Sequence, residues 1–319
     1  MAGRSGATAR RSGPDPSLRR RHRATPVSNG RVSRPLTAWA FLAPYVVAVA
    51  LLIALPALLN VGYAFTDHTG LTRDPRFVGL DNARRLLADG FLADSIRASA
   101  IHLALAVPLR LLAAIGLGLL LAAPRPGGRW FRVAVYLPTV VPDVALAVLF
   151  LWVLNPLYGP LNQLLGLFGH PGMNWLAEPG SARLAVALML AFPIGEGFIV
   201  VLAARRMLDG RLYEAAALEG CGPFGQLRRL TLPLLAPVLL LLAVRDTILT
   251  LQVNFVPAYV LTDGRPANAT LYLPVYIFDQ VFEFSGFAYG AMITSVLMVV
   301  TAVIITALLL MVRRWRVLR

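Results

Sequence analysis

The chain has 319 residues, of which 57% are hydrophobic and only 14% charged, and its net charge is +14. Soluble domains carry about 25% charged residues, so this composition excludes an ordinary soluble protein and indicates one that spans a membrane. The positive charge does not favour a nucleic-acid partner, because the arginines gather in an N-terminal tail and in short loops between apolar segments.

Residues 1–35 form a basic tail rich in Arg, Ser, Pro and Gly. Nine of the 30 basic residues of the chain lie in its first 34 positions. The tail has no apolar periodicity, so we expect it to be disordered and to contact anionic membrane lipid from the cytoplasm.

Six apolar segments are long enough to cross a bilayer, which takes about 20 apolar residues each. The predicted fold is therefore that of an all-α polytopic membrane protein, with a transmembrane domain over 36–319. The predicted spanning helices cover about 37–65, 95–122, 133–154, 183–204, 235–261 and 287–312.

The arginines also predict the orientation of these helices. The 123–132 and 205–233 loops and the C-terminus are rich in arginine, whereas 155–182 has no basic residue and 262–286 has one. Loops in the cytoplasm carry the excess of basic residues in membrane proteins. We therefore expect both termini in the cytoplasm, although 66–94 mixes arginines with aspartates and contributes little.

One cytoplasmic loop contains a short helix with the sequence YEAAALEG. Asp209 is expected to cap its start and Gly220 its end. At about 100° per residue, Tyr213, Ala216, Ala217 and Gly220 fall on one face, where small residues would let another protein approach the backbone. A simple interfacial connector explains the same residues, and their spacing does not decide between the two interpretations.

The wider pattern resembles the cytoplasmic signature of permeases of binding-protein-dependent ABC importers. That signature reads Glu-Ala-Ala, three residues, Gly, nine residues and then an apolar residue followed by x-Leu-Pro, and 214–233 matches it in register. Pro233 is expected to begin the next spanning helix. The departures from the usual residues are Glu219 for Asp, Cys221 for Ala, Leu227 for Phe and Asp209 for Pro, and none changes the register.

The resemblance covers nearly all of the chain after residue 38 and is closest to the carbohydrate-uptake branch. The segments 41–67, 77–87, 131–165 and 255–292 resemble the first helix, the first outer loop, the Pro-x-x-x-Pro helix and the stretch before the last helix of that branch. The chain is more similar to the first permease subunit of a sugar operon than to its partner subunit.

The resemblance implies a multi-pass subunit of the plasma or inner membrane that forms half of a sugar translocation pathway. Its implied partners are ABC ATPase subunits, a second permease in a heterodimer, and an extracytoplasmic solute-binding protein. The 209–222 helix would occupy a groove of an ATPase subunit and transmit its closure. Glu214, Ala215, Ala216 and Gly220 would make the coupling contacts.

We expect no enzyme activity, no cofactor and no metal on this chain. It contains no lysine, which the phosphate-binding P-loop requires, so ATP and magnesium are expected on the ATPase subunits. The four histidines (His22, His68, His102 and His170) are scattered, and no pair has the spacing of metal ligands.

Polar residues within the apolar helices are candidates for the substrate pathway, because such residues are costly in lipid and usually face an interior. Glu196 and Arg245 lie about 12 and 15 Å above the cytoplasmic ends of neighbouring helices. They therefore either form an interhelical ion pair that fixes packing or contact a hydroxyl-rich solute. The polar candidates are Arg110, Asp143, Glu196, Arg245, Asp246, Gln252 and Asn254, and all of them except Asp143 are predicted to line the pathway.

Three other classes remain open. A permease of another importer branch would share the signature loop but would match less well over 131–165 and 255–292. A secondary transporter would need no ATPase and would be expected to show inverted repeats. A membrane scaffold without transport activity would leave the charges inside the helices unexplained.

Overall fold

The computed structural model describes residues 35–71, 73–123, 126–252 and 255–317. The predicted disorder of the tail concerns residues outside the described ones, apart from residue 35, and Asn254 also lies outside them. The chain divides into two units, Met1–Leu55 and Pro56–Arg319.

The first unit contributes α1 (Pro35–Val49) and a π-helical turn, η2 (Ala50–Ala54). From residue 41 to residue 55 every side chain is exposed except that of Val49, which is half-buried. These residues are apolar almost all round the helix, and such a helix is suited to contact with lipid.

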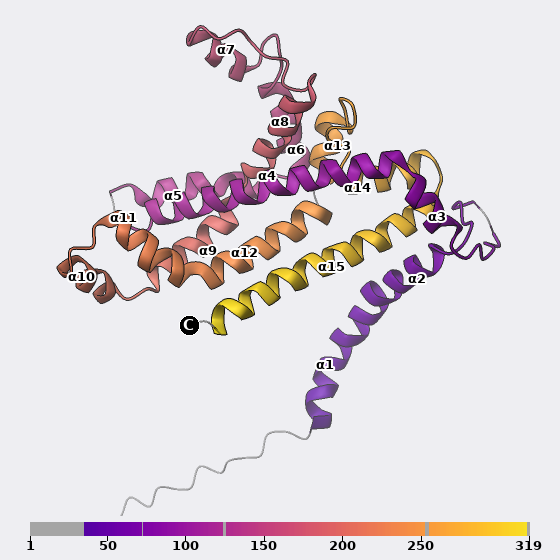
Figure 1. Ribbon diagram of the computed structural model, residues 1–319, viewed down its shortest axis with the longest axis horizontal. Helices are drawn as coiled ribbons and strands as arrows, with labels where there is room; N and C mark the ends of the chain where they lie inside the picture. The colour runs from indigo at the N-terminus through magenta and orange to yellow at the C-terminus, as the bar shows by residue number, and fades with distance from the viewer. Residues whose placement is uncertain (1–34, 72, 124–125, 253–254, 318–319) are drawn as a thin grey trace, which may run out of the picture. The chain divides into compact units, whose positions relative to one another are not determined.

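The second unit is built on four helices, namely α4 (Gly90–Leu120), α9 (Gly195–Arg206), α12 (Leu232–Gln252) and α15 (Phe287–Val317). Helix α4 contacts α9 and α12, and α12 contacts α15, so the four lie side by side (Figure 1). At Gly118 of α4 an added Cβ would lie only 2.7 Å from a methyl carbon of the α9 residue Val201. Glycine is therefore required there for α4 and α9 to pack this closely.

Shorter elements complete the second unit. Its largest apolar core joins residues of α4 with others far away in sequence, including Met189, Tyr272 and Tyr289. The remaining elements are α2 (Leu55–Tyr63), which starts at the unit boundary, α3 (Asp81–Ala88), α5 (Gly128–Tyr136), η3 (Leu137–Val140), α6 (Asp143–Val153), α7 (Pro160–Leu167), α8 (Pro179–Ala191), α10 (Gly210–Leu218), α11 (Pro223–Gln226), η4 (Leu227–Thr231), α13 (Phe255–Thr262), α14 (Leu273–Phe278) and η5 (Asp279–Glu283).

Two of the predicted spans each consist of two helices that meet at a bend. The segment predicted over 133–154 bends by 102° between η3 and α6, and that predicted over 183–204 bends by 53° between α8 and α9. Pro142 lies in the first break and Pro193 in the second. Proline lacks the N–H needed for the helical ladder, which favours a break at both places. Before Pro142, Val141 is also extended, with ψ of 129°, as expected for a residue that precedes proline.

The helix predicted over 235–261 also differs at both ends. Helix α12 ends at Gln252, and α13 follows it after two residues outside the described ones. At its start the helical run begins at Pro223, since α11, η4 and α12 are continuous over Pro223–Gln252. The π-helical turn η4 lies just ahead of Pro233, where it relieves the clash of a proline ring with the carbonyl four residues earlier.

Length and hydropathy select four helical runs of the described chain as candidates to cross a membrane, and the two bent pairs raise the number to six if each is one span. The described residues contain no named strand, only an isolated bridge between Thr66 and Phe77. The fold class predicted from composition, an all-α polytopic membrane protein, is confirmed. The four continuous runs are Phe41–Tyr63, Gly90–Leu120, Pro223–Gln252 and Phe287–Leu310.

Candidate functional site: the short helix and the charged cluster

Helix α10 is the short helix predicted in the 205–233 loop, and it lies at one end of the second unit (Figure 1). The Asp209 carboxylate accepts a hydrogen bond from the N–H of Arg211 at 2.9 Å and caps the first turn, as predicted. An acidic cap also complements the positive end of the helix dipole.

The other end of α10 closes at Gly220, as predicted. This residue has φ of +80°, in the left-handed region that glycine adopts without strain. The N–H of Cys221 donates to the carbonyl of Ala216 at 2.9 Å, and that of Gly220 donates to Ala217 at 3.0 Å. These two bonds form a Schellman motif, which satisfies the last carbonyls of a helix and fixes its length.

Side-chain contacts attach α10 to the helices on either side of it. The Tyr213 hydroxyl lies 3.0 Å from that of Thr231 in η4, and the Arg205 guanidinium lies 4.1 Å from the centre of the Tyr213 ring. The Gln226 amide donates to the carbonyls of Tyr213 at 3.4 Å and Cys221 at 3.1 Å. Helix α10 is thus joined to the end of α9 and to the start of the run that becomes α12.

Because of these contacts, only part of the face predicted for docking is exposed. Tyr213 and Ala216 are half-buried against the rest of the chain, whereas Ala217 and Gly220 are exposed. Glu214 and Ala215 are exposed as well, and the described part of the chain offers no ion pair to Glu214. The face available to a partner therefore contains Glu214, Ala215, Ala217 and Gly220, while Ala216 faces inward.

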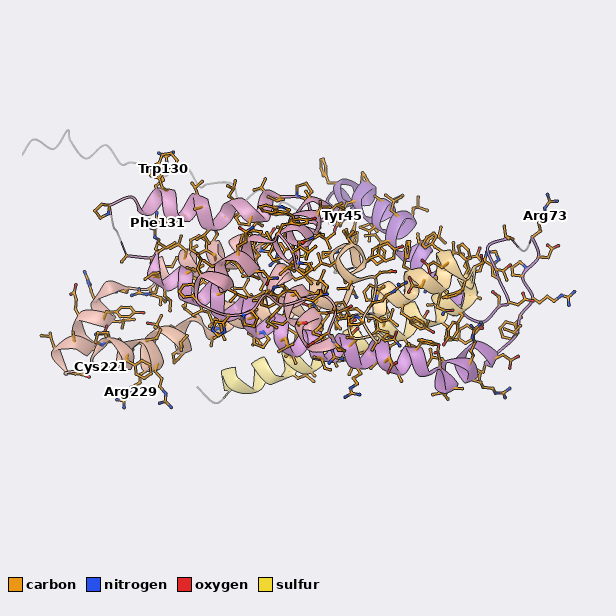
Figure 2. The ribbon with its side chains drawn as sticks, turned by 90° about the horizontal axis from the view of Figure 1, so that it is seen from above. Tyr45, Arg73, Trp130, Phe131, Cys221 and Arg229 are labelled. Atoms are coloured by element: carbon orange, nitrogen blue, oxygen red, sulfur yellow. The ribbon has the colours of Figure 1, made fainter. Side chains whose placement is uncertain are left out.

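Large apolar side chains around α10 are also exposed. Leu218 is 91% exposed, Met207 85% and Phe224 74%. Exposed apolar side chains that cluster at one place are typical of a protein–protein contact. Basic groups accompany them: Arg228 and Arg229 line a hollow of about 410 Å³ with Phe224, and Figure 2 shows Arg229 and Cys221 at the same end of the second unit.

The charged residues predicted inside the helices form one cluster. Arg245 of α12 makes ion pairs with Glu196 of α9 and with Asp246, the latter at 3.2 Å. Arg110 of α4 lines a small hollow together with Arg245 and Asp246. The juxtaposition of Glu196 and Arg245 that their depths predicted is therefore confirmed.

The two members of this pair are partly open to the outside of the chain. The Arg245 side chain is 37% exposed and that of Glu196 52%, whereas that of Asp246 is 6% exposed. Gln252 is exposed at the end of α12, about 10 Å along the helix from Arg245. The structure thus gathers Arg110, Glu196, Arg245 and Asp246, and leaves Gln252 apart.

A second polar centre, which sequence reasoning missed, lies at the opposite end of α4. One oxygen of the Asp89 carboxylate caps α4 by accepting from the N–H groups of Phe91 and Leu92, and the other accepts from the hydroxyls of Tyr276 and Tyr289. Burial raises the pKa of Asp89, but the hydrogen bonds outweigh burial and lower the pKa below its usual value.

Within the described residues, no group of three or more His, Cys, Asp and Glu side chains is placed to hold a metal ion. The arrangement instead offers a docking face at α10 and a charged cluster inside the helical bundle.

Comparison with known proteins connects these features. Residues 114–317 match the family described as "Binding-protein-dependent transport system inner membrane component". The chain belongs to this family. The matched segment includes α9, α10 and α12, and hence the docking face and most of the charged cluster.

Two relatives illustrate the range of the family. The lactose transport system permease protein LacF of Rhizobium radiobacter is 32% identical over 275 residues, which cover 83% of this chain and 90% of that protein. The diacetylchitobiose uptake system permease protein NgcF of Streptomyces coelicolor is 29% identical, with 86% of this chain and 81% of that protein covered.

A solved structure shares the fold. It is that of a bacterial ABC transporter involved in the import of the acidic polysaccharide alginate, and one of its chains superposes with a TM-score of 0.74. That match covers 88% of this chain and 96% of the other, at 22% sequence identity. The permease fold is thus common to both chains.

Proposed function

We propose that this chain is a transmembrane permease subunit of an ATP-driven ABC importer that translocates a sugar or sugar-like solute. The observation that carries the proposal is the docking face of α10, capped at both ends and joined to α9 and α12, in a chain of the binding-protein-dependent family. Relatives named for lactose and diacetylchitobiose transport support a carbohydrate as the solute.

In this proposal α10 lies in the cytoplasm and occupies a groove of an ATPase subunit. The arginines of the 205–233 loop favour that side of the membrane. Glu214, Ala215 and Gly220 make the contact, and ATP and magnesium bind to the ATPase. Because Tyr213 joins α10 to the start of the α12 run, displacement of α10 is transmitted to the helix that carries Arg245.

Transport proceeds by alternating access between outward-facing and inward-facing states. A loaded extracytoplasmic binding protein and ATP each favour the outward-facing state only to the extent that they bind it better than the other. A second permease completes the pathway, in a heterodimer. Partly exposed Glu196 and Arg245 are available to that second subunit or to the solute.

The test is binding-protein-stimulated ATP hydrolysis and sugar uptake by the complex, co-expressed with its neighbouring subunits and reconstituted in lipid. Glu214→Ala and Gly220→Trp change the docking face, and Glu178→Ala, an exposed carboxylate just before α8, is the matched control. We expect both docking-face variants to lose stimulated hydrolysis and uptake, and the control to keep them.

Two results would count against the proposal. Normal coupling in both docking-face variants would make α10 a simple connector. Uptake that continues without ATP and without the ATPase subunits would favour a secondary transporter.

A further inference from the structure

A cavity of about 450 Å³ lies at the end of the second unit remote from α10. It is open on one side and is lined by residues of α3, the 263–271 loop, α14 and η5, and Figure 1 shows α3 and α14 at that end. Its volume lies within the range of small-molecule sites, about 300–1,000 Å³. The cavity is separate from the docking face and from the charged cluster.

The charges that line the cavity do not cancel. Arg265 pairs with Asp263 at 3.5 Å, and the guanidinium of Arg85 lies 4.1 Å from the centre of the Tyr289 ring. Asp279 and Glu283 also line it, and no ion pair to either is present in the described part of the chain. Asp279 and Glu283 therefore have no ion-pair partner, and the lining as a whole, with Arg85 and Arg265 against Asp263, Asp279 and Glu283, has a net charge of −1.

Two of the residues that line the cavity each have a buried side-chain oxygen without a hydrogen-bond partner. Gln280 is only 7% exposed, and its side-chain oxygen has no partner in the structure. One carboxylate oxygen of Asp279 is likewise buried and without a partner. Buried polar atoms are nearly always bonded, and an acceptor left without a donor is costly. Both atoms accept only, so a ligand would have to supply donors.

The rim of the cavity is aromatic and its backbone is strained. Phe91 and Phe284 are 59% and 67% exposed at its edge. Four residues other than glycine have positive φ between 48° and 56°, and all lie in the 263–285 segment: Asp263, Ala267, Asn268 and Ser285. Strain of this kind persists where the surrounding structure holds it and clusters at ligand sites.

We propose that this cavity is a sugar-binding site that accepts neutral and amino sugars and rejects acidic ones. Sugar hydroxyls, or the ammonium of an amino sugar, donate to Asp279, Gln280 and Glu283, and the aromatic rim packs on the apolar face of the sugar ring. The carboxylate of an acidic sugar meets a lining whose net charge is −1 and in which Asp279 and Glu283 have no ion-pair partner. That the ligand is a sugar rests on the proposed function, whereas the selection by charge rests on the lining.

The experiment compares glucosamine, glucose and glucuronate, which share one ring and differ in charge. Their binding is measured by saturation-transfer NMR on the complex in phosphatidylglycerol nanodiscs, at pH 7.5, without ATP or binding protein. We expect glucosamine to bind about tenfold more tightly than glucuronate, with glucose between them. In the double variant Asp279→Asn, Glu283→Gln the three sugars should bind with similar affinity. The control variant Glu178→Gln should keep the order of affinities of the natural chain.

Equal binding of the three sugars, binding of none of them, or an unchanged order in the double variant would overturn the proposal. Glu283→Gln alone, at an exposed position, should weaken the order and serves if the double variant does not assemble. Binding requires no ATP, so the two proposals fail separately. If ATP-driven uptake is absent while the three sugars still bind in the expected order of affinity, only the transport function is refuted. If uptake is normal but the sugars do not bind in that order, only this site is refuted.

Discussion

The Tyr213 hydroxyl lies 3.0 Å from the Thr231 hydroxyl, across 18 residues of sequence. Thr231 in turn donates to the carbonyl of Gln226 at 3.3 Å, so the contact is part of a chain of bonds from α10 into the turn that precedes α12. Thr231 is buried, and its position is fixed by packing as well as by these bonds. Helix α10 therefore cannot move far without moving the base of α12.

Removing this one hydroxyl should weaken coupling without unfolding the helix. Tyr213→Phe keeps the ring under Arg205 and leaves Thr231 bonded to Gln226, at a cost in stability of about 1 kcal/mol. We expect ATP hydrolysis to continue while uptake per ATP falls severalfold. The ratio of sugar uptake to phosphate release measures this directly.

Tyr158→Phe is the control, since Tyr158 is exposed in the segment before α7 and shares no contact with α10. An unchanged uptake ratio in Tyr213→Phe would mean that movement reaches α12 through other contacts.

The local features of α10 could be predicted from sequence because they depend on near neighbours. Asp209 and Gly220 are caps whose effect comes from residues within one turn. The direction of the helix could not be predicted in the same way. Spacing grouped Tyr213 with Ala216, Ala217 and Gly220, but the partner at Thr231 turns Tyr213 inward, and only the fold brings that partner close.

The ion pair between Glu196 and Arg245 allows packing to be separated from solute contact. Arg245→Gln leaves Glu196 without its partner, whereas Glu196→Gln leaves Arg245 paired with Asp246 alone. Both side chains of the pair are more than a third exposed, so we expect each change to cost about 1 kcal/mol or less. The exchanged pair Glu196→Arg, Arg245→Glu restores the attraction. If the pair only fixes packing, the exchange should restore both melting temperature and uptake.

If the pair contacts the solute, the exchange should restore stability and leave uptake low. Melting of the purified complex and uptake in vesicles are measured on the same four proteins. After the exchange, the glutamate introduced at position 245 would lie beside Asp246, and the two negative charges would repel each other. The exchange would then restore only part of the melting temperature. Uptake is therefore compared with the fraction of the stability that is recovered.

The bends at Pro142 and Pro193 show where periodicity fails as a guide. Both predicted spans are mostly apolar, and hydropathy alone does not distinguish a straight helix from two helices that meet at an angle. The Asp89 centre was missed for a different reason. Its tyrosine partners lie 187 and 200 residues away, and no local pattern reports such a contact.

Asp89 should therefore be a strong contributor to stability. Asp89→Asn replaces a charged acceptor of two hydroxyls by an amide, and we expect a loss of about 2 kcal/mol at neutral pH. The lowered pKa of Asp89 means that its contribution is present above the unfolded-state value of about 3.9 and is lost as the pH falls below it. The variant and the natural chain should thus converge in acid.

Thermal melting at several pH values tests this expectation. Asp94→Asn is the control, because the Asp94 carboxylate is exposed and accepts one hydrogen bond, from Asn268 at 3.0 Å. A loss in Asp89→Asn no greater than in the control would show that the two tyrosine bonds contribute little.

The contribution of Asp279 to folding stability should depend on pH in the opposite sense to that of Asp89. Burial, followed by the charges of Glu283 and Asp263, raises the pKa of Asp279 to about 6. The folded chain therefore binds this proton more tightly than the unfolded chain, whose carboxyl has a pKa of about 3.9. Its contribution to stability is complete below about pH 4 and is lost as the pH rises through 6. Because the side chain is partly exposed, screening limits the effect to about 1 kcal/mol.

Asp279→Asn cannot ionise, so between pH 4 and 7.5 its melting temperature should rise relative to that of the natural chain. Asp74→Asn, at an exposed position in the 66–94 loop, should run parallel to the natural chain over the same range. Added glucosamine should stabilise the natural chain at pH 7.5 and have less effect on Asp279→Asn, because its ammonium would replace the missing proton. Parallel pH curves for the natural chain and Asp279→Asn would mean that this carboxylate is solvated in the folded protein, so that solvent would screen its charge and weaken the proposed selection among sugars.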